Sequence, residues 1–188
     1  MGLFDKIFGK PDPRAGILHG GIALADETER IYRNQLESIS PTGAGLLKAR
    51  LISSTFASAV YLIGGCGRGR SEEDTNSFFS ACSGIAMQPF HQPGFHPSVS
   101  QQEAVSIASS FVMPVLRLIM AESEEGPSTL DHKTEAFKKL IGIYHDCLAE
   151  SAGTKRYNAL MRHNLETAAE SIIWTHFRFL ANTLQQIR

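Results

Sequence analysis

The chain has 188 residues and a formal net charge of −1, so it is long enough to fold as one domain around its own core without disulfides or metals. Its lysines and arginines are scattered, which excludes nucleic acid as a principal partner because such binding requires many phosphates to be neutralised together. The three cysteines match no CxxC spacing. This pattern is typical of thiols in a reducing compartment and predicts a cytoplasmic protein.

The first segment with a clear pattern is GLFDKIFGK, residues 2–10, which has the spacing of a short amphipathic helix. At about 100° per residue, four large apolar side chains share one face, opposite the charged ones. These four are Leu3, Phe4, Ile7 and Phe8. Pro11 and Pro13 set the segment apart from the rest. We therefore divide the chain into an N-terminal amphipathic segment with its linker (1–13) and a helical bundle domain (14–188).

The apolar face of residues 2–10 must dock on another surface, because so short a helix is marginal alone in water. Three surfaces fit: the chain's own bundle, a groove on a partner protein, and the inner face of a membrane. Four side chains bury little apolar area, so we expect any membrane contact to be weak, reversible and peripheral.

Two helices are predicted next. A polar surface helix is expected over about residues 23–39, and an apolar helix over about residues 44–63, ended by Gly64 and Gly65. The uncharged run 51–67 reaches the lower length limit of a membrane span. Its four serine and threonine residues nevertheless favour a buried core helix, so we expect no transmembrane helix.

The stretch VYLIGGCGRGRSEED, residues 60–74, comes within one residue of the phosphate-loop pattern GxxxxGK[ST]. Arg70 stands where that pattern requires lysine, and the residues before the glycines continue a helical pattern where a phosphate loop needs a strand. The favoured interpretation is a glycine-stopped helix followed by a helix that Ser71 caps. The alternative is an anion held by Arg68, Arg70 and Ser71 at the start of that next helix.

The linker over residues 88–99 contains three prolines, which exclude a regular helix. His91 and His96 make it a weak candidate for a metal site. Two imidazoles are too few for a specific closed site, so we expect no metal. A partner-docking role for this linker stays open.

Three more helices are predicted after the linker. The first begins with a capping box at Ser100 and Glu103, and Pro114 should kink it. Its inner apolar stripe is predicted to be Ala104, Ala108, Phe111, Val115 and Ile119. The second covers about residues 130–149. The third covers about residues 154–188, where neither glycine nor proline occurs.

Trp174 and Phe177 lie off the main apolar stripe of the last helix. A helix that is apolar on more than one side is either central in its own bundle or shared with another chain. These two residues are therefore candidates for a homodimer interface, and a central position in the bundle is the favoured alternative. His176, on the main stripe, is expected to be a hydrogen-bonded core histidine.

The tripeptide His145-Asp146-Cys147 contains a base, an acid and a nucleophile. Consecutive residues on a helix point in different directions, so they cannot form a catalytic triad with one another. We expect Cys147 to be a buried structural cysteine.

These patterns predict an all-α fold: a single-domain helical bundle of five or six principal helices, with the short N-terminal amphipathic helix attached. The favoured function is a non-enzymatic adaptor or regulatory protein that binds another protein, without catalytic residues or a cofactor. The alternative is a ligand-binding bundle or enzyme whose inter-helix pocket uses His91, His96 or His176 together with Cys147.

Overall fold

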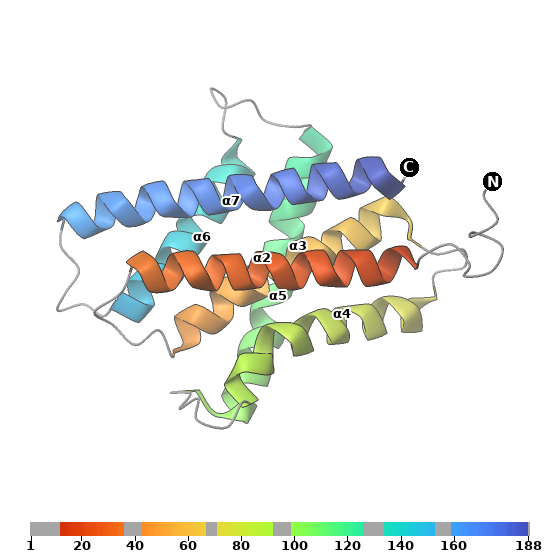
Figure 1. Ribbon diagram of the computed structural model, residues 1–188, viewed down its shortest axis with the longest axis horizontal. Coiled ribbons are helices and arrows are strands. Elements are labelled where there is room, and N and C mark those ends of the chain that lie inside the picture. Colours follow the sequence, from red (N-terminus) through yellow and green to blue (C-terminus); the bar gives the residue numbers. More distant parts are fainter. Residues whose placement is uncertain are drawn as a thin grey trace.

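The computed structural model describes residues 12–35, 43–66, 71–91, 99–125, 134–152 and 159–187. Of these residues 94% are helical, in six α-helices and no strand (Figure 1). In chain order the helices are α2 (Pro13–Gln35), α3 (Ala44–Gly64), α4 (Glu72–Met87), α5 (Gln101–Glu125), α6 (Glu135–Ala152) and α7 (Ala159–Ile187), with the short 3₁₀ helix η1 (Gln88–His91) after α4. The predicted all-α bundle is confirmed, and the predicted helix over residues 2–10 lies outside the described residues.

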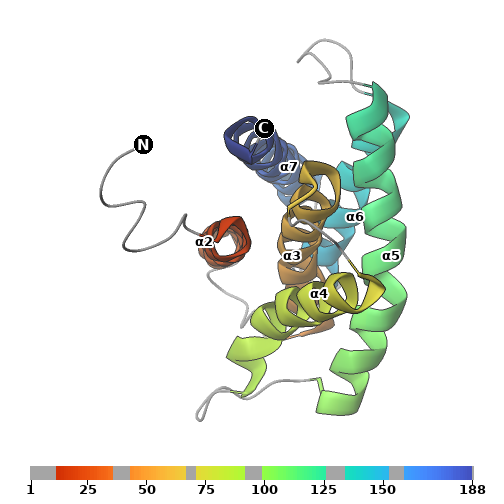
Figure 2. The same ribbon diagram turned by 90° about the vertical axis from the view of Figure 1, so that its right-hand side faces the viewer.

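Helix α3 is the central element of the bundle. Every residue from Gly45 to Tyr61 except Lys48 is buried, and the other five α-helices all pack against it. In Figure 2 α3 lies in the middle, with α2 and α7 on one side and α5 and α6 on the other. Gly65 ends α3 in the left-handed conformation, with φ of 63°, which side chains other than glycine rarely adopt. The predicted core helix and its glycine stop are confirmed.

Helix α2 begins at Pro13, ten residues before the predicted start at about residue 23, so that prediction was wrong. Proline suits the first turn of a helix because its missing N–H would have no partner there. The Asp12 carboxylate accepts a hydrogen bond of 3.0 Å from the Arg14 amide. Two glycines in the first half of α2 allow close packing: a Cβ at Gly20 would collide with the Phe179 ring, and one at Gly21 would lie 2.8 Å from Ala57 Cβ.

The predicted starts of α4 and α5 are both confirmed by their caps. Ser71 Oγ accepts a hydrogen bond of 3.0 Å from the Asp74 amide at the start of α4. Before α5 the capping box is complete, since Glu103 accepts from the Ser100 amide at 2.7 Å and the Glu103 amide donates to Ser100 Oγ at 3.3 Å. Helix α5 continues through Pro114 to Glu125.

Helices α6 and α7 form an adjacent pair against α3. Thr134 caps α6, because its hydroxyl oxygen accepts a hydrogen bond of 3.1 Å from the Phe137 amide. The same hydroxyl donates to the carboxylate of Glu122, which is buried at the end of α5. Helix α7 runs without a break for 29 residues, as the absence of glycine and proline in this part of the sequence predicted.

Candidate functional site

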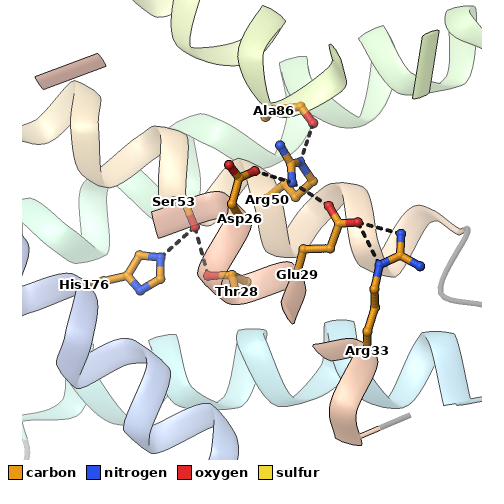
Figure 3. A network of polar contacts seen from close by, with 8 residues as sticks. All are labelled: Asp26, Thr28, Glu29, Arg33, Arg50, Ser53, Ala86 and His176. Atoms are coloured by element: carbon orange, nitrogen blue, oxygen red, sulfur yellow. Dashed lines mark hydrogen bonds and ion pairs between the residues drawn. The ribbon is translucent and has the colours of Figure 1, made fainter. Parts of the chain in front are cut away.

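A chain of buried hydrogen bonds joins three helices around His176 (Figure 3). The His176 Nδ1 lies 2.8 Å from the carbonyl oxygen of Ile172, so Nδ1 must carry the proton and donate. In the neutral ring Nε2 is then an acceptor, and Ser53 Oγ donates to it across 2.7 Å. Thr28 Oγ1 lies 3.3 Å from Ser53 Oγ and donates to it in turn. The chain therefore runs from α2 through α3 to the backbone of α7.

The Ser53–His176 hydrogen bond is the pairing that activates a serine nucleophile in many hydrolases. Ser53 and His176 are only 0% and 1% exposed, respectively. A small hollow beside this region of α3, lined by Ser54, Ala57 and Cys82, has a volume of about 10 Å³, which is room for about one water molecule. This geometry gives the pair a structural role, and His176 is a hydrogen-bonded core histidine as predicted.

Burial fixes the charge of His176 as well as its position. Desolvation lowers the pKa of His176 to about 4, although the hydrogen bond to the Ile172 carbonyl acts in the opposite direction. The imidazole is therefore neutral at physiological pH, and the stability of the bundle depends on its staying neutral.

A second polar cluster surrounds Arg50, which is 3% exposed on α3. Its Nη1 lies 2.6 Å from a carboxylate oxygen of Glu29 and 3.5 Å from one of Asp26, both on α2. Its Nε donates to the Ala86 carbonyl of α4 at 3.0 Å. Glu29 also accepts from Arg33 (Figure 3). The cluster fixes α2 and α4 to the central helix.

The described cysteines are buried and are not in disulfides: Cys66, Cys82 and Cys147. Desolvation raises the pKa of Cys82 to about 11 and that of Cys147 to about 12, so both remain thiols and weak nucleophiles at neutral pH. His145 Nδ1 lies 3.4 Å from its exposed neighbour Asp146. Cys147 is a buried cysteine, as predicted.

Trp174 and Phe177 pack inside the chain. Ring centroids are 4.6 Å apart between Phe137 and Trp174, and 5.6 Å apart between Phe137 and Phe177. The Phe177 ring also meets Phe56 edge to face at 4.9 Å. These contacts join α7 to α3 and α6, as a central position of the helix predicts. A role of Trp174 and Phe177 in a homodimer stays a prediction.

Most of the other predicted site residues lie outside the described residues: Leu3, Phe4, Ile7, Phe8, Arg68, Arg70 and His96, together with the side chain of His91. Ser71 is described, and its hydroxyl caps α4. Within the described part of the chain, no three histidines, cysteines or carboxylates converge as metal ligands. The anion site and the His91–His96 site stay predictions.

An open groove runs between α2 and α7, with Ile31, Ala168 and Ile172 as its apolar part and His163, Asn164, Thr167 and Ser171 as its polar part. None of the three histidines of the ligand-binding alternative is among these lining residues. The groove is a hollow of the surface. Its lining does not include Thr28, Ser53 or His176, so it is separate from the buried hydrogen bonds.

The outer side of α5 is the most unusual surface in the described part of the chain. Two helices, α3 and α5, are long and apolar enough to span a membrane by length and composition. Yet 83% of the apolar stretch is buried in α3 and only 22% in α5. Among the described residues, the exposed large apolar side chains are Val105 and Met113, at 51% and 49% exposure, and both belong to α5.

We define the outer face of α5 by seven of its exposed residues and the half-buried Met120: Gln102, Val105, Ser106, Ser109, Met113, Arg117, Met120 and Glu124. Arg117 is the single charge between Glu103 and Glu122. Ser109 Oγ donates to the Val105 carbonyl at 2.8 Å, so the helix itself satisfies this hydroxyl hydrogen. The face therefore exposes apolar area and few unmet donors, which lowers the cost of removing it from water.

Sequence reasoning found the inner stripe of α5 and missed its outer face. Met113 was a detectable signal, because it lies at least about 120° around the helix from Ala104, Val115 and Ile119, whereas Val105 lies only about 40° from Ile119. Arg50 was also detectable, as the last charge before a long apolar run. The hydrogen bonds that link Thr28, Ser53 and His176 could not be predicted from a local sequence pattern, since these residues are far apart in sequence.

No protein-family model matches this chain, and no curated protein or solved structure matches it either.

Proposed function

We propose that this protein is a non-enzymatic helical adaptor that acts by binding another polypeptide chain on the outer face of α5. The observation that carries the proposal is the exposure of α5, whose apolar stretch is as long as that of the core helix α3 but is mostly outside the core. Among the described residues the exposed large apolar side chains, Val105 and Met113, both lie on this helix, which favours α5 as the interaction site.

The composition of the face suits a protein partner. Methionine is enriched at interfaces because its flexible thioether fits irregular surfaces, and Met113 lies at the middle of the face. The serine hydroxyls that flank Met113 donate to their own helix, Ser109 to Val105 and Ser110 to Ser106 at 2.9 Å. A partner can cover them without leaving a buried donor unsatisfied.

The remainder of the proposal concerns residues 2–10 and rests on the sequence alone. Leu3, Phe4, Ile7 and Phe8 form a second docking face, which makes a weak peripheral contact with the inner face of a membrane or seats in a partner groove. The adaptor then acts in the cytoplasm, with its bundle carrying the partner and its N-terminal segment setting its location.

A photo-crosslinking amino acid at Ser106 tests the protein-binding function in the cells that make the protein. We expect irradiation to join the chain covalently to a polypeptide, because Ser106 lies on the outer face of α5. The matched control places the same residue at Ser80, which is exposed on α4. Absence of any adduct at Ser106, or equal adducts at both positions, would overturn the proposal.

A further inference from the structure

We propose that the polypeptide covering the outer face of α5 is a second copy of this chain, with the two α5 helices antiparallel about a twofold axis at Met113. The inference rests on the proposed function and names its partner. It is carried by the order of residues along the face and by the charge of Arg117, which has no ion-pair partner among the described residues.

Six exposed residues and the half-buried Met120, which also packs against the core, form one stripe along the outer side of α5. In order they are Gln102, Ser106, Ser109, Met113, Arg117, Met120 and Glu124, and their spacing of 4, 3, 4, 4, 3 and 4 residues is the same from either end. A twofold axis pairs such a stripe with itself. Met113 then meets its own copy, Ser106 meets Met120, Ser109 meets Arg117, and Gln102 meets Glu124.

The two polar pairs, Ser109 with Arg117 and Gln102 with Glu124, are chemically favourable. Arg117 makes no ion pair with any residue that the structure describes. Ser109 Oγ gives its hydrogen to the Val105 carbonyl, so its lone pairs are left to accept from the guanidinium of the second copy. The Gln102 amide donates to the Glu124 carboxylate. A parallel pair would instead oppose Arg117 to Arg117 and Glu124 to Glu124, and like charges repel.

The charges also favour protein over lipid as the occupant. Exposed carboxylates lie near both ends of the helix, at Glu103 and Glu124, and Arg117 lies between them. Helices that contact a bilayer concentrate their basic residues at the edges of the apolar region, where anionic lipid attracts them. In α5 that arrangement is reversed.

The area of the face sets the strength of the dimer. A helix of 25 residues is about 37 Å long and, with its side chains, about 10 Å wide. Its projected area is on the order of 400 Å² per copy, about half of what a standard stable interface buries per partner. The dimer should therefore be weak and concentration-dependent, with a Kd in the micromolar range.

Sedimentation of the purified full-length protein measures this equilibrium. Between about 1 and about 100 µM the wild-type chain should pass from monomer to dimer, and Met113→Glu should weaken association at least about tenfold. Met113 is half exposed, so this variant keeps the wild-type circular dichroism. Ser80→Glu on α4, the matched control, should dimerise like the wild type.

Cysteine crosslinking measures the register. Under mild oxidation Met113→Cys should link to its own copy, because the twofold axis passes through this position. Gln102→Cys and Glu124→Cys should each stay unlinked alone and link when the two proteins are mixed. The native cysteines do not interfere, since they are at most 3% exposed.

Three results would overturn the inference. One is a chain that stays monomeric at about 100 µM, a concentration well above the expected Kd; adducts of another protein at Ser106 would then still support the proposed function. Another is linkage of Gln102→Cys to itself, which indicates a parallel pair. The third is a monomer whose sedimentation with phosphatidylcholine and phosphatidylglycerol vesicles is abolished by Met113→Glu, which identifies lipid as the occupant.

Discussion

Helices α3 and α5 have similar length and apolar content, yet one is the centre of the bundle and the other its outer wall (Figure 2). Five helices surround α3, whereas α5 uses one side against α3 and α6 and leaves the other exposed. Apolar composition therefore does not determine where a helix lies. The distribution of apolar residues around its circumference does.

In both helices, serine or threonine hydroxyls donate hydrogen bonds to carbonyls of the same helix. In α3 the hydroxyls of Ser54, Thr55 and Ser58 donate to carbonyls three or four residues earlier, at 3.0, 2.6 and 3.0 Å. Ser109 and Ser110 do the same in α5. In α3 this bonding lets hydroxyl groups lie in a dry core. On the exposed side of α5 the same bonding lowers the cost of burying these hydroxyls, as it does for Thr167 and Thr175 on α7.

The largest expected difference between the helices is in the cost of truncating an apolar side chain. Phe56→Ala in α3 should lower the free energy of unfolding by about 3 to 5 kcal/mol, because the ring is fully buried against His176 and Phe177. Met113→Ala in α5 should change it by less than about 0.5 kcal/mol. Urea denaturation below the concentration of dimer formation measures both. Equal losses would contradict the assignment of α3 as core and α5 as surface.

The next effect is a loss of stability in acid, caused by His176. Its pKa is about 4 in the folded chain, against an ordinary value of 6.5. Between these pH values the unfolded chain binds a proton that the folded chain does not, so stability falls as pH decreases. The loss should approach about 3 kcal/mol at pH 4 and be absent above pH 7.

Denaturation at several pH values isolates the contribution of His176. The His176→Gln variant should lose most of the difference in stability between pH 7 and pH 4. His163→Gln, at an exposed position of the same helix, should keep the wild-type profile. An unchanged profile in the His176 variant would show that other groups cause the acid sensitivity.

Removing Arg50 should lower the free energy of unfolding more than removing Arg117, by a smaller margin than in the comparisons above. Arg50→Ala removes one of the two arginines that lie 2.6 Å from the mostly buried Glu29 carboxylate and leaves Arg33 as the other, which should cost about 2 to 3 kcal/mol of stability. Arg117→Ala on the outer face of α5 should cost less than about 0.5 kcal/mol in the monomer. Thermal unfolding of the two variants compares them directly. Equal losses would show that the Arg50 cluster does not hold α2 to α3.

The smallest effects should come from the serine hydroxyls. Ser54→Ala in α3 and Ser109→Ala in α5 should each change stability by less than about 1 kcal/mol, because each hydroxyl donates within its own helix. Ser109→Ala should still weaken the dimer a few-fold, since it removes the acceptor for Arg117. A loss of stability above about 2 kcal/mol for Ser54→Ala would refute the shared role of these hydroxyls.

The sequence was informative wherever a local rule applied. Gly65 ends α3 because the chain needs a positive φ there, and the Ser100–Glu103 box starts α5, as the spacing predicted. The inner stripe of α5 was also correct, since Ala104, Val115 and Ile119 are buried. These features depend only on residues within a few positions of one another.

The errors arose where the outcome depends on distant residues. Gly20 and Gly21 resemble helix breakers until Phe179 and Ala57 are known to pack against them. Likewise, the partners of Ser53 lie 25 and 123 residues away, and no periodicity relates positions so far apart. The outer face of α5 was missed because a helical pattern predicts which side is buried and does not say whether the other side will be covered.

The packing of Trp174 against Phe137 gives the molecule a built-in optical reporter. It is the chain's one tryptophan, and it lies where α6 and α7 meet. Its emission should shift to longer wavelength when the bundle opens and water reaches the indole. Joining two copies along α5 leaves this indole where it is, so its fluorescence reports unfolding without responding to assembly.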